Sequence, residues 1–95
     1  MANSNYQAGV RLERLWMAQM RVKGYYVTRS AGSHGLIDCH AWNKDEHIYA
    51  QIKNGKRAYT DNDIDKLIRM ERPKGTKVYL VVRDGGKDDW EWIQC

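Results

Sequence analysis

The feature that most constrains the fold is a pair of strand-like runs, residues 36–42 and 47–53, on either side of the polar turn Asn-Lys-Asp-Glu. This pattern predicts an antiparallel hairpin. If the turn is symmetric, Asp38 lies directly opposite Gln51, and directly opposed residues point to the same face of a sheet. Alternation along the strand adds Lys53 to that face. The opposite face should be apolar, with Ile37, Cys39, Ala41, Ile48, Ala50 and Ile52.

A first helix is predicted over residues 6–23, where apolar side chains recur at helical spacing. Ser4 with Gln7 matches a capping box at its start, and Gly24 marks its end. One arc of the helix should be buried: Ala8, Leu12, Leu15, Trp16, Met20 and Val22. Glu13 falls at the edge of this arc. Three arginines point away from it: Arg11, Arg14 and Arg21.

The remaining elements complete an α/β (α+β) domain. A short strand is predicted at 25–29, followed by a glycine-containing loop at 30–35. A second helix is predicted at 60–72, capped by Thr60 or Asp61 and ending at 73–75. It should direct three apolar side chains inward: Ile64, Leu67 and Ile68. With strands at 76–83 and 90–94, the order predicts a mixed central sheet flanked by helices.

Length and charge limit the functional classes. A chain of 95 residues is the size of one domain, so its site is complete in one core or needs a second copy. Without an apolar span or signal peptide, we expect the chain to act in the cytoplasm, with its two cysteines reduced. The net charge of +4 and the pI near 9.2 suit a polyanionic partner.

The predicted hairpin gathers an acid, an amide and an amine. The carboxylate of Asp38 is a hard oxygen ligand of the kind that Mg²⁺ prefers, and the amide oxygen of Gln51 or the backbone carbonyl of Ile52 would extend the shell. A metal there would polarise a phosphate and help to make hydroxide from water. Lys53 would stabilise negative charge on the phosphoryl group. Glu13 would add a carboxylate if the first helix packs beside the hairpin.

These residues carry a family resemblance. Glu13-Arg14 in the first helix, Arg29 ahead of Gly32-Ser33-His34-Gly35, Ile37-Asp38 and Gln51-Ile52-Lys53 resemble the motifs of PD-(D/E)xK nucleases. Their spacing in a short chain is similar to that of the archaeal-type and phage-borne Holliday junction resolvases. The motifs cover residues 9–58, and the rest matches by element order.

The resemblance implies a restriction-endonuclease-like αβββαβ core and a metal-dependent endonuclease that cuts four-way DNA junctions in recombination and repair. It implies an active site with four members: Glu13, Asp38, Gln51 and Lys53. It places Ser33 near the scissile phosphate and Arg14 and Arg29 on DNA, and it implies a homodimer. The expected cofactor is Mg²⁺, with Mn²⁺ as a substitute. The chain departs from the family at Gln51, where the pattern usually has an acid.

Further DNA contacts are expected from the residues themselves. Lys56 and Arg57 follow the site directly, beside Tyr59, and such basic and aromatic mixtures track phosphate backbones. His34, in the glycine loop, is a further candidate for touching DNA. Because phosphate contacts carry no sequence information, we expect recognition of DNA shape.

Other readings of the sequence remain open or are disfavoured. Two alternative functions share the fold: a nicking or restriction-type nuclease, and a DNA-binding module weakened in catalysis by Gln51. Structural zinc is disfavoured because Cys39 and His40 point to opposite faces of a strand. The glycine loop lacks the Lys-Ser/Thr ending of a P-loop. The small size would suit a phage-encoded protein acting in the host cytoplasm.

Overall fold

The computed structural model describes residues 4–30, 35–83 and 90–95, with the backbone alone for 4–7. The elements are α1 (Ser4–Val22), β1 (Tyr26–Arg29), β2 (Cys39–Trp42), β3 (His47–Asn54), the 3₁₀ turn η1 (Lys56–Ala58), α2 (Asp61–Arg69), β4 (Thr76–Arg83) and β5 (Trp90–Gln94). The predicted order of helix, three strands, helix and two strands is confirmed. The predicted capping box of Ser4 and Gln7 depends on side chains outside the described residues.

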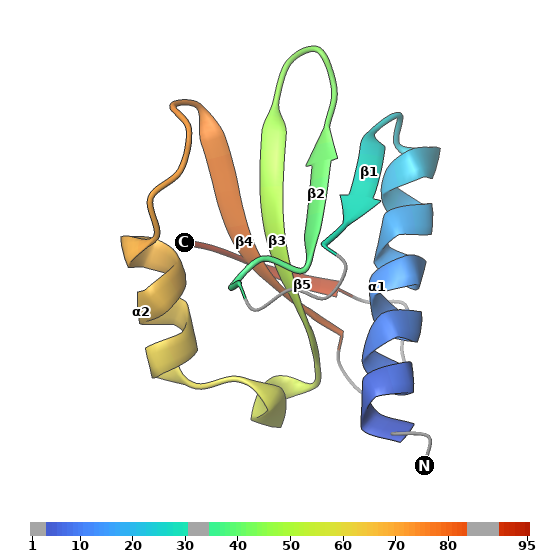
Figure 1. The fold of residues 1–95 in the computed structure, drawn as a ribbon, viewed down its shortest axis with the longest axis vertical. Coiled ribbons are helices and arrows are strands. Elements are labelled where there is room, and N and C mark those ends of the chain that lie inside the picture. The colour runs from blue at the N-terminus through green and yellow to red at the C-terminus, as the bar shows by residue number, and fades with distance from the viewer. Residues whose placement is uncertain (1–3, 31–34, 84–89) are drawn as a thin grey trace.

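The strands form one mixed sheet in the order β1-β2-β3-β4-β5 (Figure 1). The central pair, β3 and β4, is parallel, and the other neighbours are antiparallel. A parallel pair needs a crossover, which η1 and α2 supply. Within the described residues, no helix is long and apolar enough to cross a membrane.

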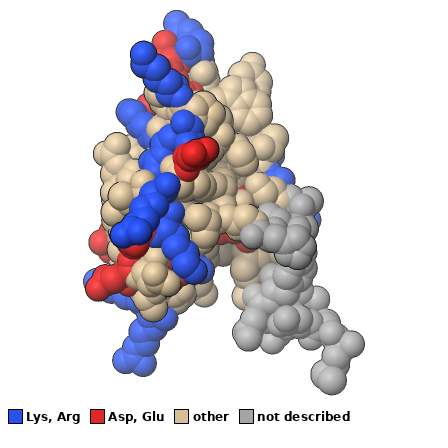
Figure 2. Space-filling view, turned by 60° about the vertical axis from the view of Figure 1, so that its left-hand side comes forward, with Lys and Arg blue, Asp and Glu red and all other residues tan. Residues whose placement is uncertain are grey.

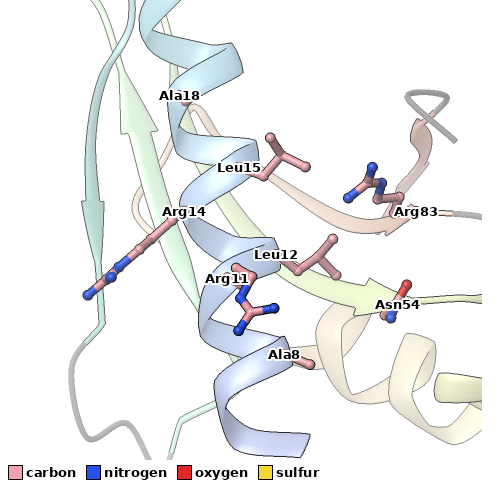
Figure 3. Close-up of a pocket in the computed structure, with 8 residues that line it drawn as sticks. All are labelled: Ala8, Arg11, Leu12, Arg14, Leu15, Ala18, Asn54 and Arg83. Carbon is pink, nitrogen blue, oxygen red and sulfur yellow. The ribbon is translucent and has the colours of Figure 1, made fainter. Parts of the chain in front are cut away.

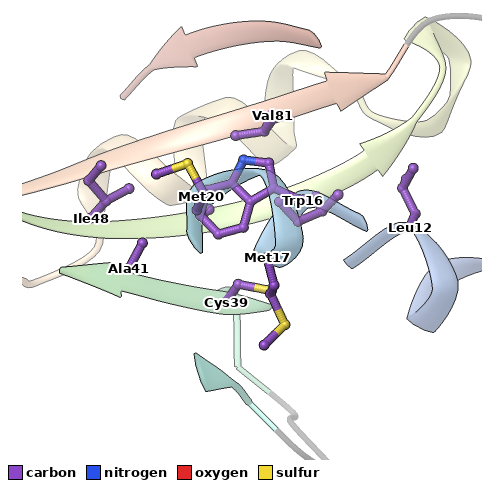
Figure 4. Close-up of a cluster of buried hydrophobic side chains, with 10 residues drawn as sticks. Leu12, Trp16, Met17, Met20, Cys39, Ala41, Ile48 and Val81 are labelled. Atoms are coloured by element: carbon purple, nitrogen blue, oxygen red, sulfur yellow. The ribbon is translucent and has the colours of Figure 1, made fainter. Parts of the chain in front are cut away.

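The first helix packs on one face of the sheet through a cluster that we call the α1-side cluster (Figure 4). Its buried members are Leu12, Trp16, Met17, Met20, Cys39, Ala41, Ile48, Ala50, Ile52 and Val81. Met17 was not predicted to be buried, and the prediction that Val22 is buried is wrong, because this side chain is 89% exposed. The helix ends at Val22, and the chain turns back at Gly24, whose φ is 95°. Ala8 is also exposed and Leu15 is half-buried.

The opposite face carries the α2-side cluster, formed by Ile37, Leu67, Val78, Leu80 and Val82. Leu67 of α2 is fully buried, and Ile64 packs against the cluster, as predicted. Ile68 is 55% exposed, so its predicted inward position is wrong. Ile68 follows the buried Leu67 by one residue, so its side chain leaves the helix axis about 100° away from that of Leu67.

The hairpin has the predicted register, with Cys39 opposite Ala50, but its regular part ends there. The amide of Asp38 also donates to the Ala50 carbonyl, at 2.9 Å. Asp38 and Cys39 thus both lie opposite Ala50, the arrangement of a β-bulge. The extra residue displaces Asp38 from its predicted place directly opposite Gln51. It also shifts the alternation by one, so Ile37 joins the α2-side cluster and its predicted place on the face of Cys39 is wrong.

The second helix begins at the predicted cap, with a reciprocal capping box between Thr60 and Asp63. It ends at Arg69, earlier than predicted, because Met70 is extended. Beyond this end the guanidinium of Arg72 donates to the carbonyls of Leu67, Ile68, Met70 and Cys95. Arg72 therefore ties the last turn of α2 to the end of β5.

We expect Arg72→Ala to lower the free energy of unfolding by about 2 kcal/mol, because carbonyls at the helix end lose a charged donor. Urea unfolding followed by circular dichroism measures this. Arg69→Ala is the matched control, since Arg69 makes only an exposed pair with Asp65 at 3.1 Å, and its loss should cost about 0.5 kcal/mol or less. Equal effects of the two substitutions would contradict the assigned role of Arg72.

Candidate active site

Strands β1 and β3 finish and β2 begins at the same end of the sheet (Figure 1), and the candidate functional residues belong to these segments. Arg29 closes β1, Asp38 precedes β2, and Gln51 and Lys53 belong to the last half of β3. Helix α1 packs along β1, β2 and β3 and brings Glu13 to this end. The charges of Glu13, Arg29 and Lys53 all act on Asp38, and Gln51 lies two residues before Lys53 on the same strand.

The bulge fixes Asp38 through three backbone contacts. Its amide donates to Ala50, its carbonyl accepts from the amide of Ser30 at 2.9 Å, and its Oδ2 accepts from the amide of Ile52 at 2.8 Å. If β2 continued regularly, a backbone carbonyl of β2 would accept from the Ile52 amide. The Asp38 carboxylate takes the place of that acceptor. Burial raises the pKa of Asp38, Glu13 adds to the rise, and the Ile52 amide and the Lys53 and Arg29 cations oppose it. A nearby cation would relieve this destabilisation of the anion.

Gln51 presents an unused acceptor. Its Oε1 atom is buried and accepts no hydrogen bond from any residue in the described part of the chain. A buried carbonyl oxygen without a donor costs free energy, and native proteins rarely keep one without a reason. An oxygen of this kind matches the demand of a hard metal ion.

The backbone of β3 offers another oxygen. In a strand the N–H and C=O of one residue point to the same side. Because the Ile52 amide binds Asp38, the Ile52 carbonyl is also directed toward the side where the Asp38 carboxylate lies. The predicted use of this carbonyl is therefore compatible with the fold.

Glu13 is held by an ion pair that the sequence did not predict. Arg29 Nε lies 2.7 Å from Glu13 Oε1, and both side chains are largely buried, at 23% and 16% exposed. A charge-assisted hydrogen bond at this depth orients the carboxylate firmly. Arg29 was expected to bind DNA, and it has a structural role in holding Glu13. The sequence signal for this pair was weak, because 16 residues separate the partners along the chain.

The positive charge of Lys53 acts on two carboxyl groups, those of Asp38 and Asp63. Its charge lowers the pKa of Asp38 and that of Asp63, where the larger cause is the hydrogen bond from the Thr60 backbone. On β3, alternation puts Lys53 on the same face as Gln51. An ammonium group beside a carboxylate and a free amide oxygen suits a site that receives a phosphate.

The oxygens available for a metal are of mixed type. Among residues 4–30, 35–83 and 90–95 the structure holds no group of three or more His, Cys, Asp or Glu side chains arranged for a metal. The ligands of a divalent cation would thus be the Asp38 carboxylate, the Gln51 amide oxygen and the Ile52 carbonyl. Glu13 could add an oxygen that its ion pair with Arg29 does not use. Hard oxygen donors of these kinds fit Mg²⁺, which keeps several waters of its own.

The other predicted DNA contacts fall into two groups. Arg14 on α1 and Lys56 and Arg57 of η1 are exposed, and η1 directly follows the strand of the site. Ser33 and His34 lie outside the described residues.

Comparisons with known proteins identify relatives of this chain. The family model of the archaeal Holliday junction resolvase (Hjc) matches residues 4–95. The crossover junction endodeoxyribonuclease Hjc of Methanocaldococcus jannaschii is 32% identical over 85 residues, which are 86% of this chain. The chain spans 63% of the length of that relative. The structure of Archaeoglobus fulgidus Hjc superposes with a TM-score of 0.74 at 20% identity, covering 92% of this chain and 72% of the other. That structural likeness concerns the fold.

Proposed function

Because this chain belongs to the archaeal Holliday junction resolvase family, we propose that it is an endodeoxyribonuclease that cuts four-way DNA junctions. The observation that carries the proposal is a half-buried carboxylate, Asp38, held by the amide of Ile52, next to which Gln51 keeps a buried Oε1 that accepts no hydrogen bond from the described residues. The relative from Methanocaldococcus jannaschii is named as a crossover junction endodeoxyribonuclease, which supports the same activity here.

The proposed cofactor is Mg²⁺, with Mn²⁺ as a substitute. Asp38, Gln51 Oε1 and the Ile52 carbonyl would hold it, since Asp38 binds the Ile52 amide and Gln51 is the neighbour of Ile52 on β3, with a buried acceptor that receives no hydrogen bond from the described residues. When bound, the ion would polarise the phosphate and lower the pKa of a water.

The chain's own residues supply the rest of the site. Lys53 would stabilise negative charge on the phosphoryl oxygens as the phosphodiester bond breaks. Glu13 would receive a proton or orient a water, and Arg29 would keep its carboxylate in place through their ion pair. Arg29 is therefore proposed as a positioning residue as well as a DNA contact.

DNA would be held by exposed cations around the site, with Arg14 on α1 and Lys56 and Arg57 on η1 as the main candidates. On the side of α2, Lys and Arg side chains form a band with Asp and Glu between them (Figure 2). Mixed charge of this kind attracts a phosphate backbone less than a purely basic stripe. The proposed path of DNA therefore runs past the site end of the sheet, with Ser33 and His34 as further proposed contacts.

The proposed active form is a homodimer, because a four-way junction is cut on two strands and one chain offers one site. Its supporting observation is the exposed stacked pair Tyr26 and Trp42, whose ring centroids lie 6.0 Å apart. We expect Tyr26→Glu to convert the dimer into a monomer in sedimentation at micromolar concentration. Asn62→Glu, which adds the same charge on exposed α2, should leave it dimeric. A wild-type monomer in the presence of junction DNA would contradict the paired cut.

The test of the function is incubation of the protein with end-labelled four-way junction, flap, nicked and linear duplexes, in Mg²⁺, Mn²⁺ or EDTA. Metal-dependent cutting of the junction in preference to the linear duplex is expected. Equal cutting of nicked or linear DNA would favour a nicking or restriction-type nuclease. Binding without cutting in either metal would favour a DNA-binding module, the alternative suggested by a neutral Gln51 at the site.

A further inference from the structure

A groove of about 620 Å³ runs along the side of α1 that faces the ends of β3 and β4 (Figure 3). The groove is lined by Ala8, Arg11, Leu12, Arg14, Leu15, Ala18, Asn54 and Arg83. Asn54 and Arg83 are paired at the ends of their strands. Glu13 lies on another side of α1, against Arg29 of β1. The groove is thus separate from the carboxylates of the candidate active site.

The lining combines a hydrophobic floor with cationic edges. Ala8, Leu12 and Leu15 supply small and branched aliphatic surface, while Arg11 and Arg83 flank it (Figure 3). Arg14 extends toward β1 in the same view. No acidic side chain is among the described residues that line the groove. A ligand that fits must therefore be anionic and have a flat or bulky apolar part.

We propose that this groove binds an unpaired nucleotide of the DNA substrate, with its phosphate at Arg11 and Arg83 and its base against Leu12, Leu15 and Ala18. The inference rests on the proposed function for the identity of the ligand. A nucleotide has the required anionic group and apolar faces, and the volume is within the usual range of small-ligand sites. Stacking on apolar surface beside cations is how proteins bind single strands without reading sequence.

The position of the groove supports this occupant. Asn54 directly follows Lys53, and alternation sends the two side chains to opposite faces of β3. A DNA strand that passes Lys53 would thus have to turn around the end of β3 to reach the groove. The Arg83 guanidinium also lies 5.8 Å from the centre of the Trp90 ring, which limits its orientations. Occupancy of the groove by a junction nucleotide would require that this nucleotide leave its base pair, which costs unstacking and unpairing free energy.

The test uses substitutions that change the groove without removing a buried side chain. Ala18→Glu places a carboxylate at an exposed groove position, and Val22→Glu places one at an exposed position of α1 outside it. Arg11→Ala removes an exposed groove cation, and Arg21→Ala removes an exposed cation of the same helix outside the groove. The probes are a fluorescent twelve-nucleotide oligothymidylate and a blunt hairpin duplex whose loop is a non-nucleotide linker, so that it has no unpaired base; binding is measured by anisotropy.

We expect Ala18→Glu and Arg11→Ala to weaken oligothymidylate binding about tenfold and hairpin binding about twofold, while both controls stay within about twofold for both probes. A photoreactive 5-iododeoxyuridine in the oligonucleotide should cross-link to residues 15–21 of α1, the peptide that trypsin releases after Arg14 and Arg21. If Ala18→Glu is poorly folded, Arg11→Ala against Arg21→Ala and the cross-link decide the matter.

The outcomes separate the groove from the proposed function. Oligothymidylate binding that is unchanged by both groove variants, in a protein that cuts junctions, overturns the groove assignment and leaves the nuclease standing. Groove-dependent binding in a protein that cuts no junction supports the assignment and removes the proposed activity. A dimer that Ala18→Glu dissociates, with unchanged binding per chain, identifies a second copy as the occupant and overturns the proposal.

Discussion

Asp38→Asn is expected to lower the single-turnover rate of junction cleavage by roughly a thousandfold or more, with little change in junction binding. The asparagine oxygen can still accept from the Ile52 amide, the contact that Asp38 makes at 2.8 Å, so the bulge should persist. What disappears is the negative charge, and loss of several kcal/mol of metal-assisted stabilisation corresponds to about three powers of ten. Cleavage of end-labelled junction and anisotropy of the same junction measure the two effects.

The matched control is Asp45→Asn, which removes an equal charge from the exposed hairpin turn and should leave the rate within about twofold. The thermal unfolding midpoint of Asp38→Asn checks that the bulge is intact, and we expect it to rise, since burial raises the pKa of Asp38 and the charged form is disfavoured. A parallel loss of cutting and binding would place Asp38 in the DNA-binding surface instead of the reacting site.

Gln51→Glu is expected to lower the Mg²⁺ concentration for half-maximal cleavage about tenfold, because hard divalent cations prefer carboxylate to amide oxygen. The Oε1 atom of Gln51 is buried and has no donor among the described residues, so the new carboxylate would take a place that no described residue fills with a hydrogen bond. The maximal rate is set by opposing effects, since added negative charge also repels the phosphate. A Mg²⁺ titration of cleavage measures the change.

A second readout does not depend on cleavage. Without metal, a carboxylate at position 51 would stand near the already disfavoured Asp38 anion, so the unfolding midpoint of Gln51→Glu should fall and recover on addition of Mg²⁺. Gln94→Glu, on the exposed end of β5, should show neither effect. An unchanged metal requirement with an unchanged midpoint would remove Gln51 from the metal shell.

The hairpin was predictable because its turn is symmetric and its alternation is strict. The pairing of Cys39 with Ala50 follows from these features. The bulge at Asp38 was not predictable, since a bulge leaves the residue types unchanged and alters only which backbone groups pair. For this reason alternation predicted the wrong face of the sheet for Ile37.

Errors in the helices concentrate at their ends. Val22 and Ile68 continue an apolar arc by periodicity, yet each lies within two residues of a helix end and is exposed. Periodicity predicts the direction in which a side chain leaves the helix, but it does not show how far along the helix the sheet extends to cover it. Leu12 and Trp16, in the interior of α1, are buried as predicted, and so is Leu67, which lies close to the end of α2 but packs against the sheet.

The candidate site residues, Glu13, Asp38, Gln51 and Lys53, were chosen from their chemistry and order along the chain, and their roles stay a prediction. Their hydrogen-bond and ion-pair partners could not be predicted in the same way. The ion pair between Glu13 and Arg29 depends on how α1 packs on β1, which no local pattern fixes. The groove beside Arg11 likewise arises from the distance between α1 and the ends of two strands.

The sheet order bears on the sequence of events in folding. β2 and β3 are joined by a short turn, whereas β3 and β4 are parallel and meet only through the crossover of η1 and α2. Local hairpins close faster than non-local pairs, because loop-closure entropy must be overcome first. Yet β3 carries Gln51 and Lys53, and its half beyond Ala50 pairs with β4 and not with β2. We therefore expect the half of β3 that bears the candidate site to become ordered only when β4 pairs with it.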